Sequence, residues 1–383
     1  MMYIEYIKKV LLLLIVSGGV YVIFSIFCVA KFFRLKREEG ESASLTPVSV
    51  LKPVKGGDPD FRTNIESFCR QDYPEYEVLL GFTDPADSAI STAEEVASAE
   101  PDRKVRVVIG EKNIGVNQKV SNLQGLIEEA RYPLLVISDS DMKVERQYLK
   151  RIVTEYSSRE NVGLVTSLYK ISDPSSAGAA LESLTVALDF IPSVLVAARL
   201  EGITFGLGAS IVVSKDAIDA FGGLAVIADY LADDYQIGNR LWKKGYKLIL
   251  SDYVIEDVVG DMSLGEYLVH QVRWSRTYRA SRPKGFFGYG LTHTVAFAVA
   301  ILILQPSHHS VVRLGVVLLL RLSLGLVVCQ RVIRSRKWLK WLVLLPIKDL
   351  ISFGIWGWSF MGRNVYWRGR YYRIVRGGRI EPA

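Results

Sequence analysis

The sequence predicts an α/β fold in which a mostly parallel sheet is covered by helices and attached to membrane segments. Between residues 41 and 285, short apolar runs alternate with helical stretches of ten or more residues. Before them, Val10–Ala30 is an uninterrupted apolar run, long enough to cross a bilayer. Half of the 383 residues are apolar, and the mean hydropathy is +0.21. We therefore expect a Rossmann-like domain, with helices on both faces of its sheet, flanked by transmembrane helices.

The charge distribution favours a membrane surface over nucleic acid. The net charge is +7, and the basic residues concentrate beside apolar segments. Two lysines precede the first apolar run and four basic residues follow it, which modestly favours a cytoplasmic position for the domain that follows. A cleaved signal peptide is disfavoured, because its apolar region is typically about 7 to 15 residues long.

Four short apolar runs in the first half are predicted strands. Lys52 and Pro53 are expected to end the first strand, and a helix is expected around Asp60–Arg70. Asp58 and Pro59 suit the cap and the first turn of that helix. The predicted strands are Val48–Leu51, Glu77–Phe82, Val105–Ile109 and the run that begins at Leu134.

Two acids follow the fourth predicted strand in the segment LLVISDSDM, residues 134–142. Side chains two residues apart on an extended chain point the same way, so Asp139 and Asp141 are expected to face one spot. Ligands of open α/β sheets lie at this end of the strands. A divalent cation that carries substrate phosphates takes one or two carboxylates. Because such triplets also arise by chance, the position after a buried strand is what favours a metal site for a nucleotide.

Further polar residues follow the neighbouring strands. Asp84 comes after the second predicted strand, and the loop Asn113–Lys119 comes after the third, so both are expected at the same sheet edge. Taken singly, Asp84 suits a turn and Lys119 suits a solvated helix. The segment Gly206–Gly208 lacks the third glycine of a dinucleotide-binding fingerprint, which disfavours a dehydrogenase.

The second half of the domain adds an apolar segment and a cluster of acids. Leu181–Leu200 is interrupted by Asp189 and Pro192, which favours an interfacial helix pair or ordinary core packing over a span. A glycine turn and strand are expected over Phe205–Ser214. Acids of the segment 229–235 then stand at the start of a helix predicted over Asp234–Lys244. They complement the helix dipole, or one of them is a general base.

His270, Arg273 and Trp274 have the spacing of one helix face. A cation beside an aromatic ring suits a pyrophosphate and a sugar or acceptor headgroup. Arg and Trp are also common beside membranes, so a membrane-proximal helix is the alternative.

The chain is expected to return to the membrane after residue 285. Phe286–Gln305 and Leu314–Gln330 are predicted spans, although Arg321 interrupts the second. The basic segment Arg331–Lys340 is expected in the cytoplasm. Trp341–Met361 is expected to be re-entrant or interfacial, which leaves the basic tail in the cytoplasm. The predicted parts are an anchor (1–40), a catalytic domain (41–285), and membrane or interfacial helices with a basic tail (286–383).

An ordered set of motifs resembles the ceramide glucosyltransferase family of inverting GT-A glycosyltransferases, including bacterial members associated with hopanoid biosynthesis. The resemblance spans nearly the whole chain. The matching segments are LKPVKG at 51–56, TDPAD at 83–87, GVNQKVSNL at 115–123, SDSD at 138–141, ADDY at 232–235 and VRW at 272–274.

The resemblance implies the roles of individual residues. It implies that Asp139 and Asp141 serve a Mg²⁺ or Mn²⁺ ion and the donor, and that Asp234 is the catalytic base. Lys119 and Arg273 are expected to stabilise the leaving group. His270 stands where the family has Gln or Arg, which leaves its role open, whereas Trp274 keeps the motif. Nucleotide-sugar contacts are expected from Lys52, Pro53, Asp84, Asn117, Lys119 and Asp139.

The resemblance implies a UDP-sugar donor, a membrane lipid acceptor and a location in the bilayer, in a bacterial inner membrane, with no nucleic-acid partner. No residue decides between glucose and N-acetylglucosamine as the donor sugar, or between ceramide and a hopanoid as the acceptor, although the segment WRGRYYRI at 367–374 resembles the hopanoid-associated members slightly more. A polyprenyl-phosphate sugar synthase, a processive polysaccharide synthase and a non-catalytic nucleotide-sugar-binding membrane protein are the alternatives.

Overall fold

The computed structural model describes residues 2–34, 45–100, 105–110 and 112–383. The described residues form two compact units that interleave along the chain, and we describe each unit by itself. The helical unit takes its residues from Met1–Lys36, Ile171–Leu200 and Asp261–Tyr366. The sheet unit takes its residues from Arg37–Lys170, Glu201–Gly260 and Trp367–Ala383.

The sheet unit is built on a mixed sheet of eight strands, which confirms the predicted α/β class. The first four strands of the order pair in parallel, and β7 joins them to the rest by antiparallel pairing with both β4 and β6. The strand order is β3 (Val105–Ile109), β2 (Tyr76–Phe82), β1 (Val48–Val54), β4 (Leu134–Ile137), β7 (Ile211–Ser214), β6 (Val162–Lys170), β8 (Lys247–Asp257) and β5 (Met142–Lys143).

The predicted end of the first strand is wrong. Strand β1 continues through Lys52 and Pro53 to Val54, and its residues are buried throughout. Strand β4 ends at Ile137, the partner of Leu51, so none of the described strands lies beside Pro53 on that side. A proline is tolerated there because no neighbouring strand on that side needs its missing N–H group.

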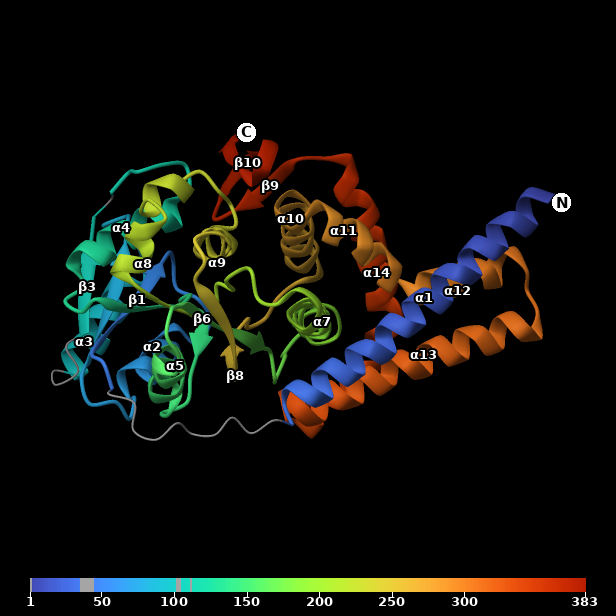
Figure 1. Cartoon of the computed structure of the whole chain (residues 1–383), viewed down its shortest axis with the longest axis horizontal. Helices are drawn as coiled ribbons and strands as arrows, with labels where there is room; N and C mark the ends of the chain where they lie inside the picture. Colours follow the sequence, from blue (N-terminus) through green and yellow to red (C-terminus); the bar gives the residue numbers. More distant parts are fainter. Residues whose placement is uncertain (1, 35–44, 101–104, 111) are drawn as a thin grey trace. The chain divides into compact units, whose positions relative to one another are not determined.

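Helices cover both faces of this sheet. Figure 1 shows α4, α8 and α9 on one face, and α2 and α5 on the other. The first face is packed through apolar residues such as Leu135, Leu123 and Ile237. The helices of the unit are α2 (Phe61–Cys69), α3 (Ile90–Ala99), α4 (Gln118–Glu129), α5 (Tyr148–Ser157), α8 (Lys215–Ala220), η3 (Leu224–Ile227), α9 (Asp233–Lys243) and η8 (Arg376–Gly378).

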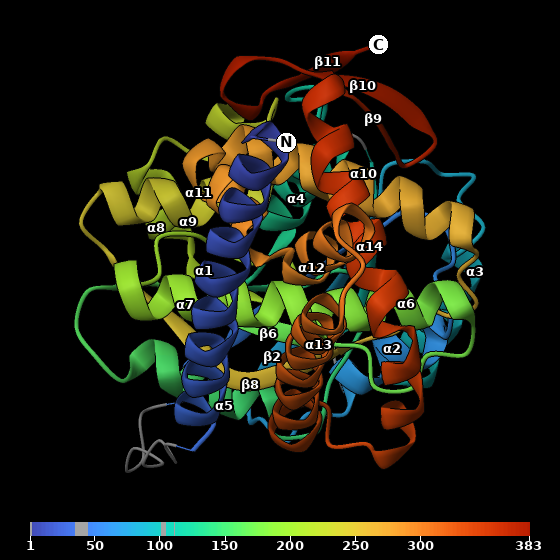
Figure 2. The same cartoon turned by 90° about the vertical axis from the view of Figure 1, so that its right-hand side faces the viewer.

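The helical unit contains the segments that are long and apolar enough to cross a membrane. Among the described residues three helices meet this criterion: Glu5–Phe32, Ala177–Glu201 and His308–Ile333. Figures 1 and 2 show α1 (Met2–Phe32) beside α12 (Thr294–Leu304) and α13 (His308–Val328). The other elements are α6 (Ala177–Thr185), η2 (Val186–Phe190), α7 (Ile191–Glu201), α10 (Leu264–Ser281), α11 (Pro283–Tyr289), η4 (Gly290–Thr292), η5 (Cys329–Ile333), η6 (Arg336–Leu344), α14 (Leu345–Trp358), η7 (Ser359–Met361) and β9 (Asn364–Trp367).

Two predicted membrane segments differ in the structure. The span predicted at Phe286–Gln305 is a pair of helices, Pro283–Thr292 and Thr294–Leu304, bent by 51°. The segment predicted as too interrupted for a span, Leu181–Leu200, lies in one helical stretch, Ala177–Glu201, that has the length and hydropathy of a span. Its middle is the π-helical turn η2, just before Pro192, which has no N–H group for a helical hydrogen bond. Most of this stretch is buried in the structure.

The charges that interrupt the apolar helices are paired with one another. Arg321 of α13 lies 2.6 Å from Asp349 and 2.9 Å from Asp189. Lys348 lies 2.7 Å from the same two carboxylates. The side chains of Arg321, Lys348 and Asp349 are buried and that of Asp189 is 10% exposed, so the charged residues of α13, α14 and η2 pair with each other within the helical unit.

Candidate active site

The turn after β4 holds Asp139 and Asp141, at the edge where the sequence predicts a ligand. Lys52 supports this turn from the sheet, because its Nζ atom donates a hydrogen bond of 2.7 Å to the backbone oxygen of Asp139. The Lys52 side chain is fully buried, and its Nζ atom lies 3.6 Å from the centroid of the Phe68 ring. Burial lowers the pKa of Lys52 to about 7, against the opposing effect of the nearby carboxylates.

Asp141 carries an oxygen that the described residues leave without a partner. Its Oδ1 atom is buried and accepts no hydrogen bond from them. Burial, together with the charges of Asp139 and Asp58, raises the pKa of Asp141 to about 7. An unpaired buried carboxylate oxygen is costly, so this atom suits a cation or a donor that arrives with the substrate.

Asp58 stands beside the same turn and was missed as a site residue by the sequence analysis. Its carboxylate accepts a hydrogen bond from the hydroxyl of Ser140, and burial raises its pKa. The predicted role of Asp58 as a helix cap is wrong, because Asp60, with a φ of 53°, is the residue before α2. Asp58 follows β1 just as the other acids follow their strands. This shared position after a strand could have identified Asp58 as a site residue from the sequence.

Lys119 links the Asp-x-Asp turn to a second group of acids. Its Nζ atom lies 2.6 Å from Asp139 Oδ1 and 3.5 Å from Asp233 Oδ2, and the side chain is buried. Burial alone lowers the pKa of Lys119, but the carboxylates of Asp139, Asp233 and Asp234 outweigh this effect, and its pKa lies above the ordinary value. Lys119 is therefore a permanent cation between two anionic groups.

Asn117 positions Lys119 through the start of α4. Its Oδ1 atom accepts hydrogen bonds from the backbone N–H groups of Lys119 (2.9 Å) and Val120 (3.3 Å). Its Nδ2 atom donates to the backbone oxygen of Tyr230 at 2.7 Å. These bonds make Asn117 a helix cap, and its predicted contact with the nucleotide sugar stays a prediction.

Asp234 lies in the first turn of α9, and its carboxylate and that of Asp139 both lie next to Gly208. The Oδ2 atom of Asp234 accepts a hydrogen bond of 2.8 Å from the Gly208 backbone N–H. A Cβ atom on Gly208 would lie 3.1 Å from Asp139 Oδ2 and 3.3 Å from Asp234 Oδ2, so only a glycine fits without pressing on both carboxylates. Burial and the charge of Asp233 raise the pKa of Asp234 to about 6, against the effect of Lys119.

Asp84 lies in the loop after β2 and closes a local turn. Its Oδ1 atom accepts a hydrogen bond of 2.9 Å from the Ala86 backbone N–H, and the residue is exposed. Asp87, three residues later in the same loop, accepts a hydrogen bond of 2.8 Å from the Gly56 backbone N–H, which connects this loop to the loop after β1. The turn agrees with the alternative interpretation of Asp84, and its contact with a nucleotide stays a prediction.

His270, Arg273 and Trp274 share a face of α10 in the helical unit. His270 Nδ1 lies 3.0 Å from Glu182 Oε1, and Gln271 Nε2 donates to both oxygens of Glu182. The ring of Trp274 packs 5.3 Å from the ring of His270. The buried Glu182 thus contacts His270, the residue at which the chain departs from the family motif. The sequence analysis did not identify Glu182 as a functional residue.

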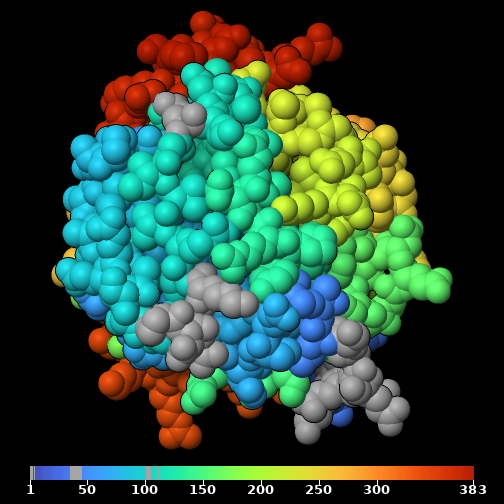
Figure 3. Space-filling model, turned by 90° about the vertical axis from the view of Figure 1, so that its left-hand side faces the viewer, coloured from blue at the N-terminus to red at the C-terminus, as the bar shows by residue number. Residues whose placement is uncertain are grey.

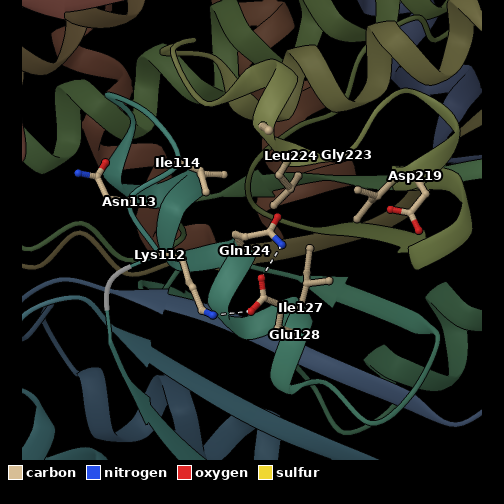
Figure 4. Close-up of a pocket in the computed structure, with 11 residues that line it drawn as sticks. Lys112, Asn113, Ile114, Gln124, Ile127, Glu128, Asp219, Gly223 and Leu224 are labelled. Atoms are coloured by element: carbon tan, nitrogen blue, oxygen red, sulfur yellow. Dashed lines mark hydrogen bonds and ion pairs between the residues drawn. The ribbon is translucent and has the colours of Figure 1, made fainter.

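A pocket of about 530 Å³ lies elsewhere in the sheet unit; it is lined by Asn113 at the start of the predicted loop, but not by Lys119 or the predicted site carboxylates. Figure 4 shows it between α4 and the segment around Leu224, with Lys112 and Gln124 both directed at Glu128. Lys112 lies 2.7 Å and Gln124 lies 2.9 Å from that carboxylate. The pocket borders the C-terminal half of α4, whereas Lys119 stands at its N-terminal end, so we do not assign it to the donor.

A divalent cation fits the Asp-x-Asp turn only together with a substrate. Among the described residues, no group of three or more His, Cys, Asp and Glu side chains is arranged to hold a metal ion by itself. Within the described part of the chain, Asp141 Oδ1 has no hydrogen-bond partner, and Asp139 Oδ2 lies next to Gly208, which has no side chain. Mg²⁺ and Mn²⁺ that carry phosphates take only one or two carboxylates and complete their shell with water and phosphate oxygens. The residues present are compatible with such a site.

Comparison with known sequences decides the family. The sequence profile described as glycosyl transferase family 21 matches residues 10–380, which is nearly the whole chain. The chain belongs to glycosyl transferase family 21. The resemblance found in the ordered motifs is therefore confirmed.

Curated relatives of this family 21 chain are ceramide glucosyltransferases. Ceramide glucosyltransferase 3 of Caenorhabditis elegans is 28% identical over 251 residues, which are 66% of this chain and 54% of the relative. Ceramide glucosyltransferase 1 of the same organism is 28% identical over 276 residues, 71% of this chain and 59% of the relative. The chain thus spans little more than half the length of these relatives.

The family 21 chain shares its fold with a solved glycosyltransferase. The mannosyltransferase PcManGT of Pyrobaculum calidifontis, solved with GDP-mannose and Mn²⁺, superposes with a TM-score of 0.58 at 16% identity. The match covers 92% of this chain and 99% of that chain. The predicted GT-A fold is confirmed, and the chain also contains candidate membrane helices.

Proposed function

We propose that this protein is a membrane-bound inverting glycosyltransferase that moves a hexose, glucose or N-acetylglucosamine, from a UDP-sugar to the hydroxyl of a lipid such as ceramide or a hopanoid. Membership of family 21 and the relatives named as ceramide glucosyltransferases support the enzyme class and the lipid acceptor. The observation that carries the proposal is that the carboxylates of Asp139 and Asp234 both lie next to Gly208. The Nζ atom of Lys119 lies beside them, 2.6 Å from Asp139 Oδ1.

The donor half of this site is the turn after β4. Asp139 and Asp141 are the residues that would hold Mg²⁺ or Mn²⁺, and the bound ion would neutralise the diphosphate as a Lewis acid. Lys119, which is buried and cationic, would stabilise the charge that develops on the departing UDP. Arg273 is proposed for the same task, with His270 and Trp274 beside it on α10, because its motif matches that of the family.

Asp234 is proposed as the general base. Its pKa of about 6 keeps the carboxylate ionised at neutral pH, yet close enough to the working pH to accept a proton efficiently. It would take the proton of the acceptor hydroxyl while that oxygen attacks the anomeric carbon from the side opposite UDP. The bond to UDP breaks as the bond to the lipid oxygen forms, so an α-linked donor yields a β-glycoside.

The membrane-length helices support a lipid acceptor that is reached at the bilayer. We propose that the sheet unit faces the cytoplasm, where nucleotide sugars are made, in the inner membrane of a bacterium. The basic residues that flank α1 support this orientation.

A labelled-sugar assay tests the function. The protein in detergent is incubated with radiolabelled UDP-glucose or UDP-N-acetylglucosamine and with ceramide or hopanoid lipids, with and without EDTA. We expect one sugar per lipid molecule, with the product formed from one donor and lost in EDTA. A polymer or a sugar-phosphate lipid would contradict the proposal, as would the absence of any product from either donor; full activity in EDTA would contradict the metal assignment.

A further inference from the structure

The C-terminal tail, residues 367–383, packs on the sheet unit, to which it belongs. Strands β10 (Arg370–Ile374) and β11 (Ile380–Pro382) form an antiparallel pair. Figure 3 shows the C-terminal end, in red, beside the teal and yellow-green segments of this unit. The tail carries five arginines and a single acid, Glu381. It therefore brings positive charge to a unit whose candidate site is rich in carboxylates.

One end of the tail is fixed beside the loop that positions Lys119. The Ile380 backbone N–H donates to the Asp229 backbone oxygen at 2.7 Å, and the guanidinium of Arg379 lies 5.5 Å from the centroid of the Tyr230 ring. The Asp229 side chain accepts a bond of 3.0 Å from the Val116 backbone N–H, and Tyr230 accepts the bond from Asn117. Asp229 and Tyr230 thus contact both the tail and the loop that precedes Lys119.

The other end of the tail reaches the loop after β1. Lys55 Nζ donates to the backbone oxygen of Arg368 at 2.9 Å and to Gln118 Oε1, next to Lys119, at 3.2 Å. Three residues beyond Lys55, the Asp58 carboxylate accepts the Ser140 hydroxyl from within the Asp-x-Asp turn. Arg368 is therefore connected through Lys55 to Gln118 at the start of α4, and the loop that holds Lys55 also contacts the Asp-x-Asp turn.

The backbone turns the tail tightly at Arg368. Arg368 and Gly369 form a two-residue turn with φ of 50° and 81°, a pattern typical of a tight hairpin. Along β10, Tyr372 and Ile374 are buried and Arg373 is exposed. Because side chains alternate along a strand, Arg370 lies on the same side of β10 as Tyr372 and Ile374, although its own side chain is exposed at the end of the strand, and Arg373 lies on the opposite side.

Three cations gather at this turn. Burial, followed by the positive charges of Arg368 and Arg370, lowers the pKa of Lys55. Like charges held together are unfavourable unless an anion joins them. Arginine guanidinium groups match phosphate oxygens with paired hydrogen bonds, so a diphosphate is an anion of suitable chemistry.

We propose that Arg368 and Arg370 of the tail, together with Lys55, bind the diphosphate of the nucleotide-sugar donor. The tail is then part of the donor site. This inference rests on the proposed function, because it requires a nucleoside diphosphate at this edge of the sheet.

Calorimetric titration of the full-length protein with UDP, GDP and uridine tests the proposal. The double variant Arg368→Gln/Arg370→Gln is expected to bind UDP about tenfold or more weakly, because each charged hydrogen bond contributes that much. Its affinity for uridine, which lacks phosphates, is expected to stay the same. The matched control Arg373→Gln, on the outward face of β10, is expected to bind UDP like the wild type.

A second variant separates charge from folding. Arg368→Lys/Arg370→Lys keeps the positive charges without the paired donors and is expected to fall between the wild type and the glutamine variant. UDP affinity unchanged in the glutamine variant would overturn the inference, and so would an equal loss for UDP and uridine, which indicates a general structural defect. If the wild-type protein binds neither UDP nor GDP, the proposed function itself fails; this result is read before any variant is compared.

Discussion

The Nζ atom of Lys119 lies 2.6 Å from Asp139 Oδ1 and 3.5 Å from Asp233 Oδ2, so one buried cation joins the turn after β4 to the start of α9. These residues are about one hundred positions apart in the chain. The contact sets the electrostatics of the site, because the same lysine opposes the rise in the pKa of Asp234. Four of the predictions that follow concern this group of residues or its immediate neighbours.

The acid limb of the pH profile should report Asp234. Its pKa is raised to about 6, so the base is ionised above this pH and becomes protonated as the pH falls through it. We expect kcat/KM to fall about tenfold for each unit below pH 6. Transfer rates at limiting acceptor, measured across this limb, check the prediction. A rate that stays constant well below pH 6 would remove a group of this pKa from the reaction.

Replacing Lys119 with methionine should move that limb to higher pH as well as slow the reaction. The positive charge that opposes the rise in the pKa of Asp234 is then lost. Transfer should fall by about a hundredfold or more, in the range found for the removal of a group that stabilises developing charge. Lys112→Met, on the exposed side of the unit, is the control and should leave both rate and limb unchanged. A slower rate with an unmoved limb would contradict the electrostatic role.

Gly208→Ala should inactivate the protein without unfolding it. The new methyl group would lie 3.1 Å from Asp139 Oδ2 and 3.3 Å from Asp234 Oδ2, and would push the two carboxylates apart. Gly125→Ala is the matched control, because its Cβ meets only Lys112 Cγ at 3.5 Å within a helix. Activity and the thermal unfolding midpoint are measured for both variants. An active Gly208→Ala enzyme would show that the two carboxylates do not act across this position.

Arg321→Met should destabilise the helical unit. The substitution leaves Lys348 as the one cation that the described residues pair with Asp189 and Asp349, and breaking a buried charge network costs roughly 3 to 5 kcal/mol. Arg313→Met, on the same helix but partly exposed, is the control and is expected to change stability by less than about 0.5 kcal/mol. The unfolding midpoint in detergent measures both. Equal midpoints for Arg321→Met and the wild type would show that the network contributes little.

Much of the sheet edge could be predicted because its signals are local. The apolar run at Leu134 and the two acids after it identify a buried strand that ends at a ligand site, and β4 and the turn holding Asp139 have this arrangement. The segment 113–119 follows β3 in the same way and delivers Lys119 to the site. Periodicity and strand order suffice for such residues.

The residues that sequence analysis missed depend on contacts between distant segments. Gly208 was examined only as part of an incomplete fingerprint, although its lack of a side chain is what lets Asp139 and Asp234 meet. Glu182 lies in an apolar segment, and only the packing of α6 against α10 makes it the partner of His270. Pro53 was predicted to end the first strand because a proline cannot donate a hydrogen bond to a neighbouring strand. The neighbouring strand β4 ends before it reaches Pro53, and the residues of β1 do not reveal this.

The most direct test of the account compares nucleotide binding with transfer in Asp234→Asn. Asparagine keeps the size of the side chain but cannot take the proton of a lipid hydroxyl, whereas Asp139, Asp141 and Lys119 still provide the donor site. Asp216→Asn, an exposed acid in the first turn of α8, is the control. We expect Asp234→Asn to bind UDP with the wild-type affinity and to transfer no sugar. Sustained transfer by this variant would contradict the assignment of Asp234 as the base at a shared catalytic edge.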